Sequence, residues 1–197
     1  MIFLDERNNL SFKESRILHV TVSIIIVTFL FSALPEWYTP QFIMNSVVSS
    51  ILVIIIVVSW RLVELKVRYF SIQSYCLVFS LSFLFAQPLI KYFWQEGNSI
   101  WFFLLGIWVA GFIITTLLKE NIFQAFSKTF ENRFSVAFHI VVFICITAGP
   151  MFIIIGTAND FNKNISYGSV LYLMSALLQI TLPAFLKHPK AIMSKSI

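Results

Sequence analysis

Two neutral polar residues, His139 and Gln179, stand inside long apolar stretches of this sequence. An imidazole and a primary amide both donate and accept hydrogen bonds, so together they would suit a site for a neutral, hydrogen-bonding ligand. A neutral histidine in such surroundings could also change its charge near neutral pH. The third interpretation is structural, with each side chain bonded to a backbone group or a hydroxyl of the surrounding helices. The residue types alone leave all three interpretations open.

A proline lies near each of these two residues. Pro183 has no N–H, so the carbonyl of Gln179, four residues earlier, loses its helical partner, and Pro150 does the same to the carbonyl of Ile146. Carbonyls freed in this way inside a membrane need a neighbouring side chain or a water molecule. We therefore predict a ligand-binding site made of His139, Gln179, Pro150 and Pro183, with simple kinking of the two helices as the alternative.

Enzymatic chemistry finds little support in the sequence. His139 and Cys145 are six residues apart, which on a helix means about 120° of rotation and roughly 9 Å of rise, too far for a nucleophile and its base. The sequence contains no Gly-x-Ser-x-Gly and no His-Glu-x-x-His pattern. Cys76 and Cys145 are not spaced as a metal-binding pair. We expect no catalytic residues, no metal and no cofactor, and predict that the protein is not an enzyme.

The elements that would position these residues are long apolar stretches. The sequence is 58% hydrophobic and 12% charged, whereas soluble domains average about 45–50% and 25%. Six stretches have about the length of the roughly 20-residue helix that crosses a bilayer. They are residues 17–34, 42–60, 74–90, 99–118, 134–156 and 166–186.

The fifth stretch, 134–156, holds the most informative residues: His139, Cys145 and a Gly149-Pro150 pair. We expect it at the centre of the protein, with the other five stretches packed around or beside it. Small residues four positions apart predict close contacts between helices. Three such pairs are Gly106 with Ala110, Ser46 with Ser50, and Ser82 with Ala86.

Other polar residues in the stretches are less informative. His19 and Asn45 lie near the ends of their stretches, where we expect lipid head groups and water to satisfy them. Gln87 lies close to the outer end of the third stretch and is only slightly more informative. No Asp, Glu, Lys or Arg falls well inside any stretch. This absence disfavours a proton- or ion-coupled carrier, since such carriers usually keep an ionisable residue within the membrane.

The distribution of basic residues predicts the orientation. Twelve of the fourteen lie at the two ends of the chain or in the gaps after the second and fourth stretches, and only Lys91 and Lys163 lie in the other gaps. Short cytoplasmic loops are enriched in Lys and Arg. We therefore expect six spans in the cell membrane with both termini cytoplasmic. The net charge of +5 is spread over these gaps and does not indicate nucleic-acid binding.

The remaining segments complete the expected organisation. Residues 1–16 form a cytoplasmic N-terminal segment, 17–186 the transmembrane domain and 187–197 a basic cytoplasmic tail. A capping box at Ser11–Glu14 predicts that a helix begins near Ser11. The amphipathic segment Lys119–Arg133 predicts a helix on the cytoplasmic surface. Its apolar arc is made of Ile122, Phe123, Phe126 and Phe130.

The sequence thus predicts an all-α integral membrane protein, a six-span transmembrane helical bundle with a cytoplasmic amphipathic surface helix between spans four and five. The favoured function is binding or moving a neutral or lipophilic small ligand, as a permease does. The alternative is an accessory or immunity-type subunit that acts through a membrane protein partner, and an intramembrane enzyme is the third class. The expected partners are the lipid bilayer and, in the alternative, another membrane protein, but not nucleic acid.

Overall fold

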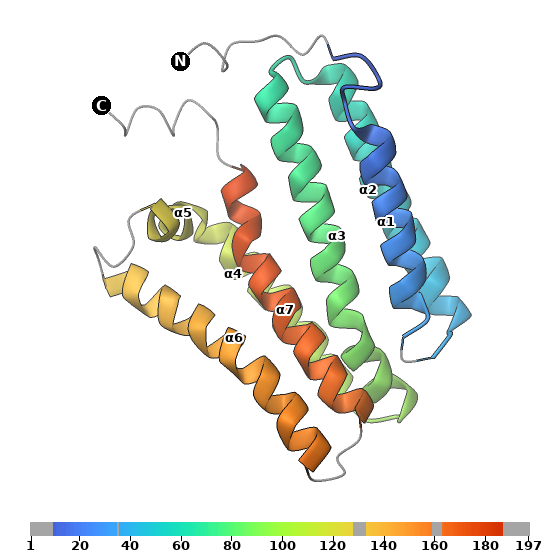
Figure 1. Ribbon diagram of the computed structural model, residues 1–197, viewed down its shortest axis with the longest axis vertical. Coiled ribbons are helices and arrows are strands. Elements are labelled where there is room, and N and C mark those ends of the chain that lie inside the picture. Colours follow the sequence, from blue (N-terminus) through green and yellow to red (C-terminus); the bar gives the residue numbers. More distant parts are fainter. Residues whose placement is uncertain (1–9, 35, 128–132, 159–162, 187–197) are drawn as a thin grey trace.

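The computed structural model describes residues 10–34, 36–127, 133–158 and 163–186. All the secondary-structure elements of that part of the chain are helices (Figure 1), which confirms the all-α prediction. The helices in chain order are α1 (Ile17–Ser32), α2 (Thr39–Leu62), α3 (Lys66–Gln95), α4 (Ile100–Leu117), α5 (Lys119–Ser127), α6 (Arg133–Ala158) and α7 (Lys163–Leu186).

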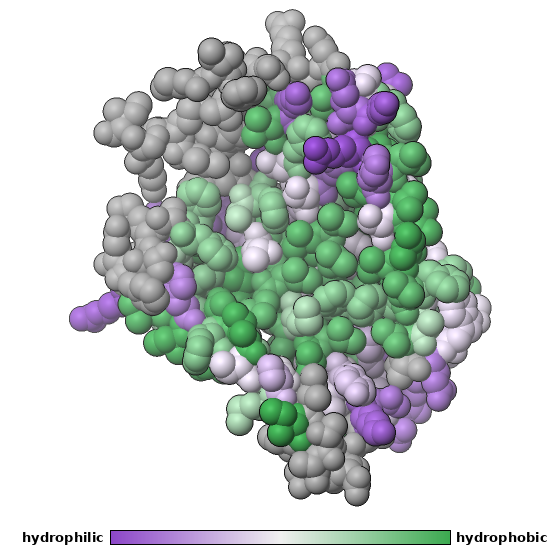
Figure 2. Space-filling view, viewed as in Figure 1, coloured by the Kyte–Doolittle hydropathy of each residue, from purple (hydrophilic) through white to green (hydrophobic). Residues whose placement is uncertain are grey.

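Five of these helices are long and apolar enough to cross a membrane, by length and composition: α2, α3, α4, α6 and α7. Helix α1 is apolar as well but has 16 residues. Large apolar side chains such as Phe103, Leu117 and Ile154 lie exposed on the helices, and Figure 2 shows an apolar band across the middle of the visible face. Soluble proteins rarely expose so much continuous apolar surface, so the chain has the surface of a membrane protein.

Helix α3 lies at the centre of the bundle. It contacts α1, α2, α4 and α7, and its contact with α7 is the most extensive between any two helices of the described residues. It is also the longest of these helices, at 30 residues. Polar and small residues are buried along it, among them Ser80, Ser82 and Ala86.

The expectation that residues 134–156 lie at the centre is wrong. Helix α6 packs mainly on α7 and α5 at the edge of the bundle, and Phe143, Ile144 and Ile146 are exposed on it. The physical reason is that lipid tails are as apolar as leucine, so an apolar surface alone does not drive a helix into the interior of a membrane bundle. Polar groups that bond across helices do so, and α3 has several, among them Ser82 and Gln87.

The three predicted small-residue pairs have different surroundings. Ser46 is half-buried and Ser50 is exposed on α2. Ser82 and Ala86 are both buried in α3, as expected. Gly106 and Ala110 lie exposed on α4, and a Cβ at Gly106 would meet nothing within 4 Å. Close approach occurs instead at Gly168 of α7, where a Cβ would lie 3.2 Å from the Cα of Leu89 in α3.

The capping box at the N-terminal end is present, but the helix starts later than expected. The side-chain and backbone groups of Ser11 bond to Glu14 Oε2 at 2.8 and 3.0 Å. Residues 12–16 form a turn, and α1 begins at Ile17 because Arg16 has a left-handed conformation with φ of 56°. The hydroxyl of Tyr69 and the amide of Gln73 donate to the carbonyl of Ser15, which fixes this turn on α3.

The amphipathic segment is helical over Lys119–Ser127, and the rest of its predicted range, residues 128–132, lies outside the described residues. Ile122 and Ala125 are buried, and α5 packs against α6 and α7. Phe126 is exposed but meets Phe138 of α6 edge-on, with ring centroids 5.1 Å apart. Part of the predicted apolar arc therefore faces the protein.

Candidate functional site

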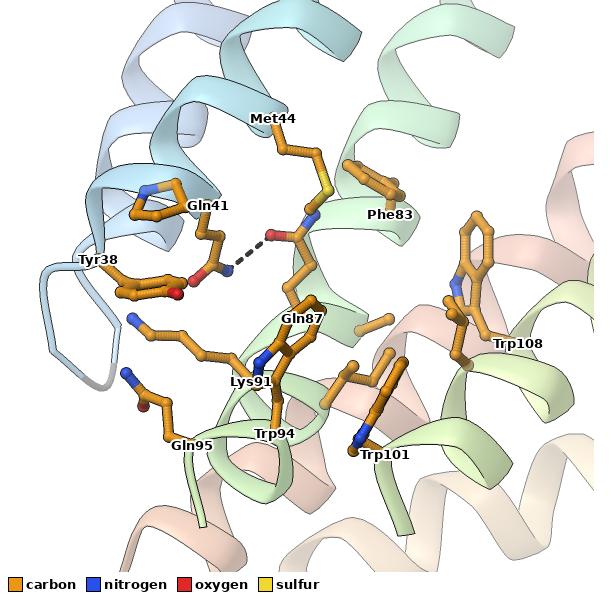
Figure 3. A pocket seen from close by; sticks show the side chains of 14 residues that line it. Tyr38, Gln41, Met44, Phe83, Gln87, Lys91, Trp94, Gln95, Trp101 and Trp108 are labelled. Atoms are coloured by element: carbon orange, nitrogen blue, oxygen red, sulfur yellow. Dashed lines mark hydrogen bonds between the residues drawn. The ribbon is translucent and has the colours of Figure 1, made fainter. Parts of the chain in front are cut away.

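A pocket of about 230 Å³ lies on α3 between α2 and α4 (Figure 3). Most of its lining is aromatic or aliphatic, with three glutamines and one lysine at its polar side. The lining residues are Tyr38, Pro40, Gln41, Met44, Phe83, Ala86, Gln87, Ile90, Lys91, Trp94, Gln95, Trp101, Leu105 and Trp108. This set contains no carboxylate, histidine or cysteine, and its ionisable groups are those of Tyr38 and Lys91.

Helical periodicity explains why these residues face one space. On α3, Phe83, Gln87, Ile90 and Trp94 follow each other at intervals of three or four residues, which places them on one face of the helix. On α2, the pocket is reached by the first turn, where Tyr38 is the N-cap and Pro40 occupies an early position that needs no N–H. The pocket is therefore built at the ends of helices, next to the turn between α1 and α2 and the turn between α3 and α4.

The central polar contact is an amide pair. Gln41 Nε2 donates to Gln87 Oε1 over 2.7 Å, from α2 to α3. Both side chains are only 6% exposed, yet Gln41 Oε1 and Gln87 Nε2 have no hydrogen-bond partner. A buried polar atom without a partner costs about 1–3 kcal/mol, and native proteins contain few of them. Two such atoms in one pair indicate a site that is completed by something else.

Lys91 lies one helical turn from Gln87 and is also buried. Its Nζ donates to the carbonyl oxygens of Leu34, at 3.2 Å, and of Glu36. The ammonium also lies 5.9 Å from the centroid of the Tyr38 ring. Lys91 thereby fastens the turn between α1 and α2 to α3, and it forms one side of the pocket (Figure 3).

The opposite side of the pocket is aromatic. The rings of Trp94 and Trp101 stack with centroids 4.9 Å apart, and Phe83 meets Trp108 edge-on at 5.8 Å. Two hydrogen bonds to α7 fix Trp108. The Nε1 of Trp108 donates to Ser175 Oγ at 2.9 Å, and the carbonyl of Trp108 accepts from Gln179 Nε2 at 3.0 Å. Tryptophan and tyrosine favour the level of the lipid head groups.

The four residues predicted from the sequence to form a site differ in burial and in the helices that they contact. Gln179 is buried in α7 and bonds to α4 as described, while His139 Nδ1 lies 2.7 Å from the carbonyl oxygen of Ser135 in its own helix. Pro183 is buried inside α7, and Pro150 is exposed on α6. A shared ligand site of these four residues stays a prediction.

The residues of the pocket were not expected from the sequence. Gln87 was given little weight because it lies near a helix end, but it is buried. Asn45, next to the pocket in sequence but not part of its lining, was expected to meet head groups and water, yet it is buried and its Nδ2 donates to Ser32 Oγ at 2.9 Å. A signal was available on α2, where Gln41, Asn45 and Ser49 recur every four residues and so share one face. A polar stripe within an apolar helix marks a buried seam, and here it faces α1 and α3.

Comparison with protein-family models, with curated proteins and with solved structures found no match for this chain. Among the described residues there is also no group of three or more His, Cys, Asp or Glu side chains that could hold a metal ion. The argument about function therefore rests on the pocket and its chemistry.

Proposed function

We propose that this protein is a six-span protein of the cell membrane, with both termini cytoplasmic, that binds and moves a neutral or lipophilic small ligand. The pocket between α2, α3 and α4 is its binding site. The observation that carries the proposal is the buried pair of Gln41 and Gln87, each with an unpartnered amide atom, in a pocket with aromatic and aliphatic walls.

The arrangement of the helices supports the proposed topology. In Figure 1, the start of α1, the end of α2, the start of α3 and the end of α7 lie at one end of the bundle, together with α5. The turn between α3 and α4 lies at the opposite end. Counting α1 as a crossing helix gives six passes, which agrees with the distribution of basic residues. The pocket would then lie near the outer head-group level, and α5 at the cytoplasmic side.

The size and walls of the pocket support a lipophilic ligand. An engineered cavity of about 150 Å³ with apolar walls is known to take up benzene, so about 230 Å³ has room for a ring or a few methylene groups. Met44 and Leu105, on the two flanking helices, are 47% and 39% exposed. A ligand dissolved in the bilayer could therefore reach the pocket from the side, without crossing an aqueous loop.

Native mass spectrometry after extraction in mild detergent tests the ligand function. Leu105→Trp would fill the pocket from α4, whereas Ile107→Trp adds the same ring to the same helix at an exposed position outside the pocket. We expect a bound small molecule on the wild type and on Ile107→Trp, and its loss from Leu105→Trp. A wild-type protein that carries no small molecule but a stoichiometric protein would instead support the accessory-subunit function.

One observation favours the second function, an accessory subunit that acts through a membrane protein partner. Gly106 and Ala110 lie exposed on α4, and small residues at this spacing commonly let two membrane helices approach closely. None of the described residues lies within 4 Å of a Cβ built at Gly106. This face of α4 would suit a helix of a membrane protein partner, and Gly106→Leu should release such a partner without affecting the pocket.

A further inference from the structure

We propose that the pocket binds the head group of a neutral single-chain lipid amphiphile, an amide or an alcohol, through the Gln41–Gln87 pair. This proposal rests on the ligand-binding function above and narrows it to a chemical class. The ligand would supply one hydrogen-bond acceptor and one donor to the pair, with its chain lying in the apolar part of the groove.

The first step is the hydrogen-bond capacity of the pair. Each primary amide has an acceptor oxygen and a donor nitrogen, and the single bond between Gln41 and Gln87 leaves Gln41 Oε1 and Gln87 Nε2 without a partner. Both atoms are buried beneath the apolar surface of the pocket, so a head group reaches them only when lining side chains turn aside, as side chains commonly do on binding. Turning both amides over would exchange these atoms but would again leave one acceptor and one donor. The need for a ligand with both functions therefore holds for either orientation of the amides.

The second step decides between a neutral and an anionic head group. The unpartnered acceptor of the pair requires a hydrogen-bond donor, which a carboxylate or a phosphodiester lacks. Lys91 would attract an anion, but two of the three N–H groups of its ammonium already donate to the carbonyl oxygens of Leu34 and Glu36. A primary amide or a hydroxyl head group satisfies the pair without displacing these contacts.

The third step concerns the body of the ligand. The pocket lies on α3 between two flanking helices, and its rim residues Met44, Trp94 and Leu105 are partly exposed on the lipid-facing surface. A volume of about 230 Å³ holds a head group and only part of a long chain, so the rest of the chain would remain in the bilayer. Tryptophan at this level places the head group at its usual depth.

A competition experiment tests the proposal on full-length protein in nanodiscs. Tritiated dodecanamide serves as the bound probe, and scintillation proximity reports its displacement by dodecanamide, dodecan-1-ol, methyl dodecanoate, dodecane and dodecanoate. These molecules share one chain length and differ in whether their heads donate, accept, do both or carry charge. We expect the amide and the alcohol to compete at least about tenfold better than the methyl ester, the hydrocarbon and the carboxylate. A tenfold difference in affinity corresponds to the loss of about one hydrogen bond to a buried group.

Variants of Gln41 and Gln87 test whether this pair causes the preference for amide and alcohol head groups. Gln41→Met with Gln87→Met keeps side-chain length and removes both amides, and it should bind the amide no better than the methyl ester. Gln124→Met on α5, outside the pocket, is the matched control and should keep wild-type selectivity. If the double variant does not fold, the competition series on the wild type still decides.

Three outcomes overturn the proposal. Equal competition by amide and methyl ester in the wild type would mean that water, not a head group, completes the pair, and the ligand-binding function would stand. Preference for dodecanoate would assign head-group recognition to Lys91. Binding of none of the probes, together with no small molecule in the extracted protein, would remove both this proposal and the proposed function.

Discussion

Ser82 of α3 and Ser175 of α7 bond to each other's backbone at the centre of the bundle. The hydroxyl of Ser175 donates to the carbonyl of Ser82 over 2.6 Å, and the hydroxyl of Ser82 lies 3.1 Å from the carbonyl of Ser175. Both residues are fully buried. Serine is small enough to let the two helices approach and polar enough to join them, which is the combination that drives helix association in membranes.

Replacing Ser175 by Ala should lower the free energy of unfolding by roughly 0.6–1.5 kcal/mol, the usual range for a hydrogen bond between membrane helices. The indole N–H of Trp108 also loses its partner, Ser175 Oγ. The measurement is unfolding in mixed micelles, followed by circular dichroism. Ser50→Ala, at an exposed position of α2, is the control and should change the unfolding free energy little. Equal effects of the two variants would contradict the importance of the serine contact.

Two glycines should respond in opposite ways to alanine. A Cβ at Gly168 would lie 3.2 Å from the Cα of Leu89, and backbone atoms cannot move aside cheaply, so Gly168→Ala should destabilise the fold by about 1–3 kcal/mol. Gly106 has open space at the same position, so Gly106→Ala should stabilise the isolated protein by up to about 1 kcal/mol, because alanine is the better helix former. The same unfolding assay compares them, and a neutral Gly168→Ala would mean that α3 and α7 are farther apart than described.

The capping box gives a prediction about titration. The hydroxyl of Ser11, and then its backbone N–H, hold the pKa of the Glu14 carboxyl below its ordinary value of 4.5. A lowered pKa in the folded state means that these bonds stabilise the turn above the unfolded-state pKa, and that this stabilisation is lost as pH falls through the folded-state pKa. Ser11→Ala should raise the pKa of Glu14 toward 4.5. NMR titration of the labelled carboxyl measures it, and an unchanged pKa would show that Ser11 is not its partner in solution.

The helices themselves were largely predictable because their ends carry strong local signals. The first and fourth stretches, 17–34 and 99–118, correspond closely to α1 and α4, and the Gly97-Asn98 turn separates α4 from α3. Gly97 has a φ of 67°, which favours glycine. The third stretch was underestimated, because Lys66 and Arg68 interrupt the hydropathy but not the helix. Lysine and arginine are good helix formers.

The pocket was harder to predict because it depends on tertiary contacts. Gln41 and Gln87 are separated by 46 positions in the sequence, and each lies near a helix end, where water would be the ordinary partner. Only the packing of α2 on α3 removes that water. The expectation that α6 is central came from the concentration of His139, Cys145 and the Gly149-Pro150 pair in its stretch, and the hydropathy of the stretch could not correct it, since hydropathy does not distinguish a helix that faces lipid from one that faces protein.

Reporter fusions test the proposed topology of six spans. Fusions after Leu10, Gln124 and Lys195 should report a cytoplasmic location, and fusions after Trp37, Gly97 and Asn162 an external one. The reason is the excess of Lys and Arg at the first set of positions. Because α1 has only 16 residues, the decisive position is Trp37. A cytoplasmic reading there would mean that α1 and α2 do not cross separately, and the topology would have five spans or fewer.

The last prediction concerns the pairing of His139 with Gln179. The hydrogen bonds of Gln179 and His139 lead to different helices, since Gln179 bonds to the carbonyl of Trp108 in α4 and His139 to the carbonyl of Ser135 in α6. Gln179→Leu should therefore destabilise the contact between α4 and α7 by about 0.6–1.5 kcal/mol, and His139→Leu should cost less, because the bond to Ser135 that it removes lies within one helix.

A double-mutant cycle decides whether the two residues act together. We expect the effects of His139→Leu and Gln179→Leu on unfolding to add within about 0.5 kcal/mol, as they do for residues that share no partner. The same cycle is then measured on binding of tritiated dodecanamide. Additive stability with a coupled loss of binding would support the shared ligand site predicted from the sequence. Additivity in both measurements would leave His139 as a packing residue, and Gln179 as a residue that positions Trp108 at the wall of the pocket.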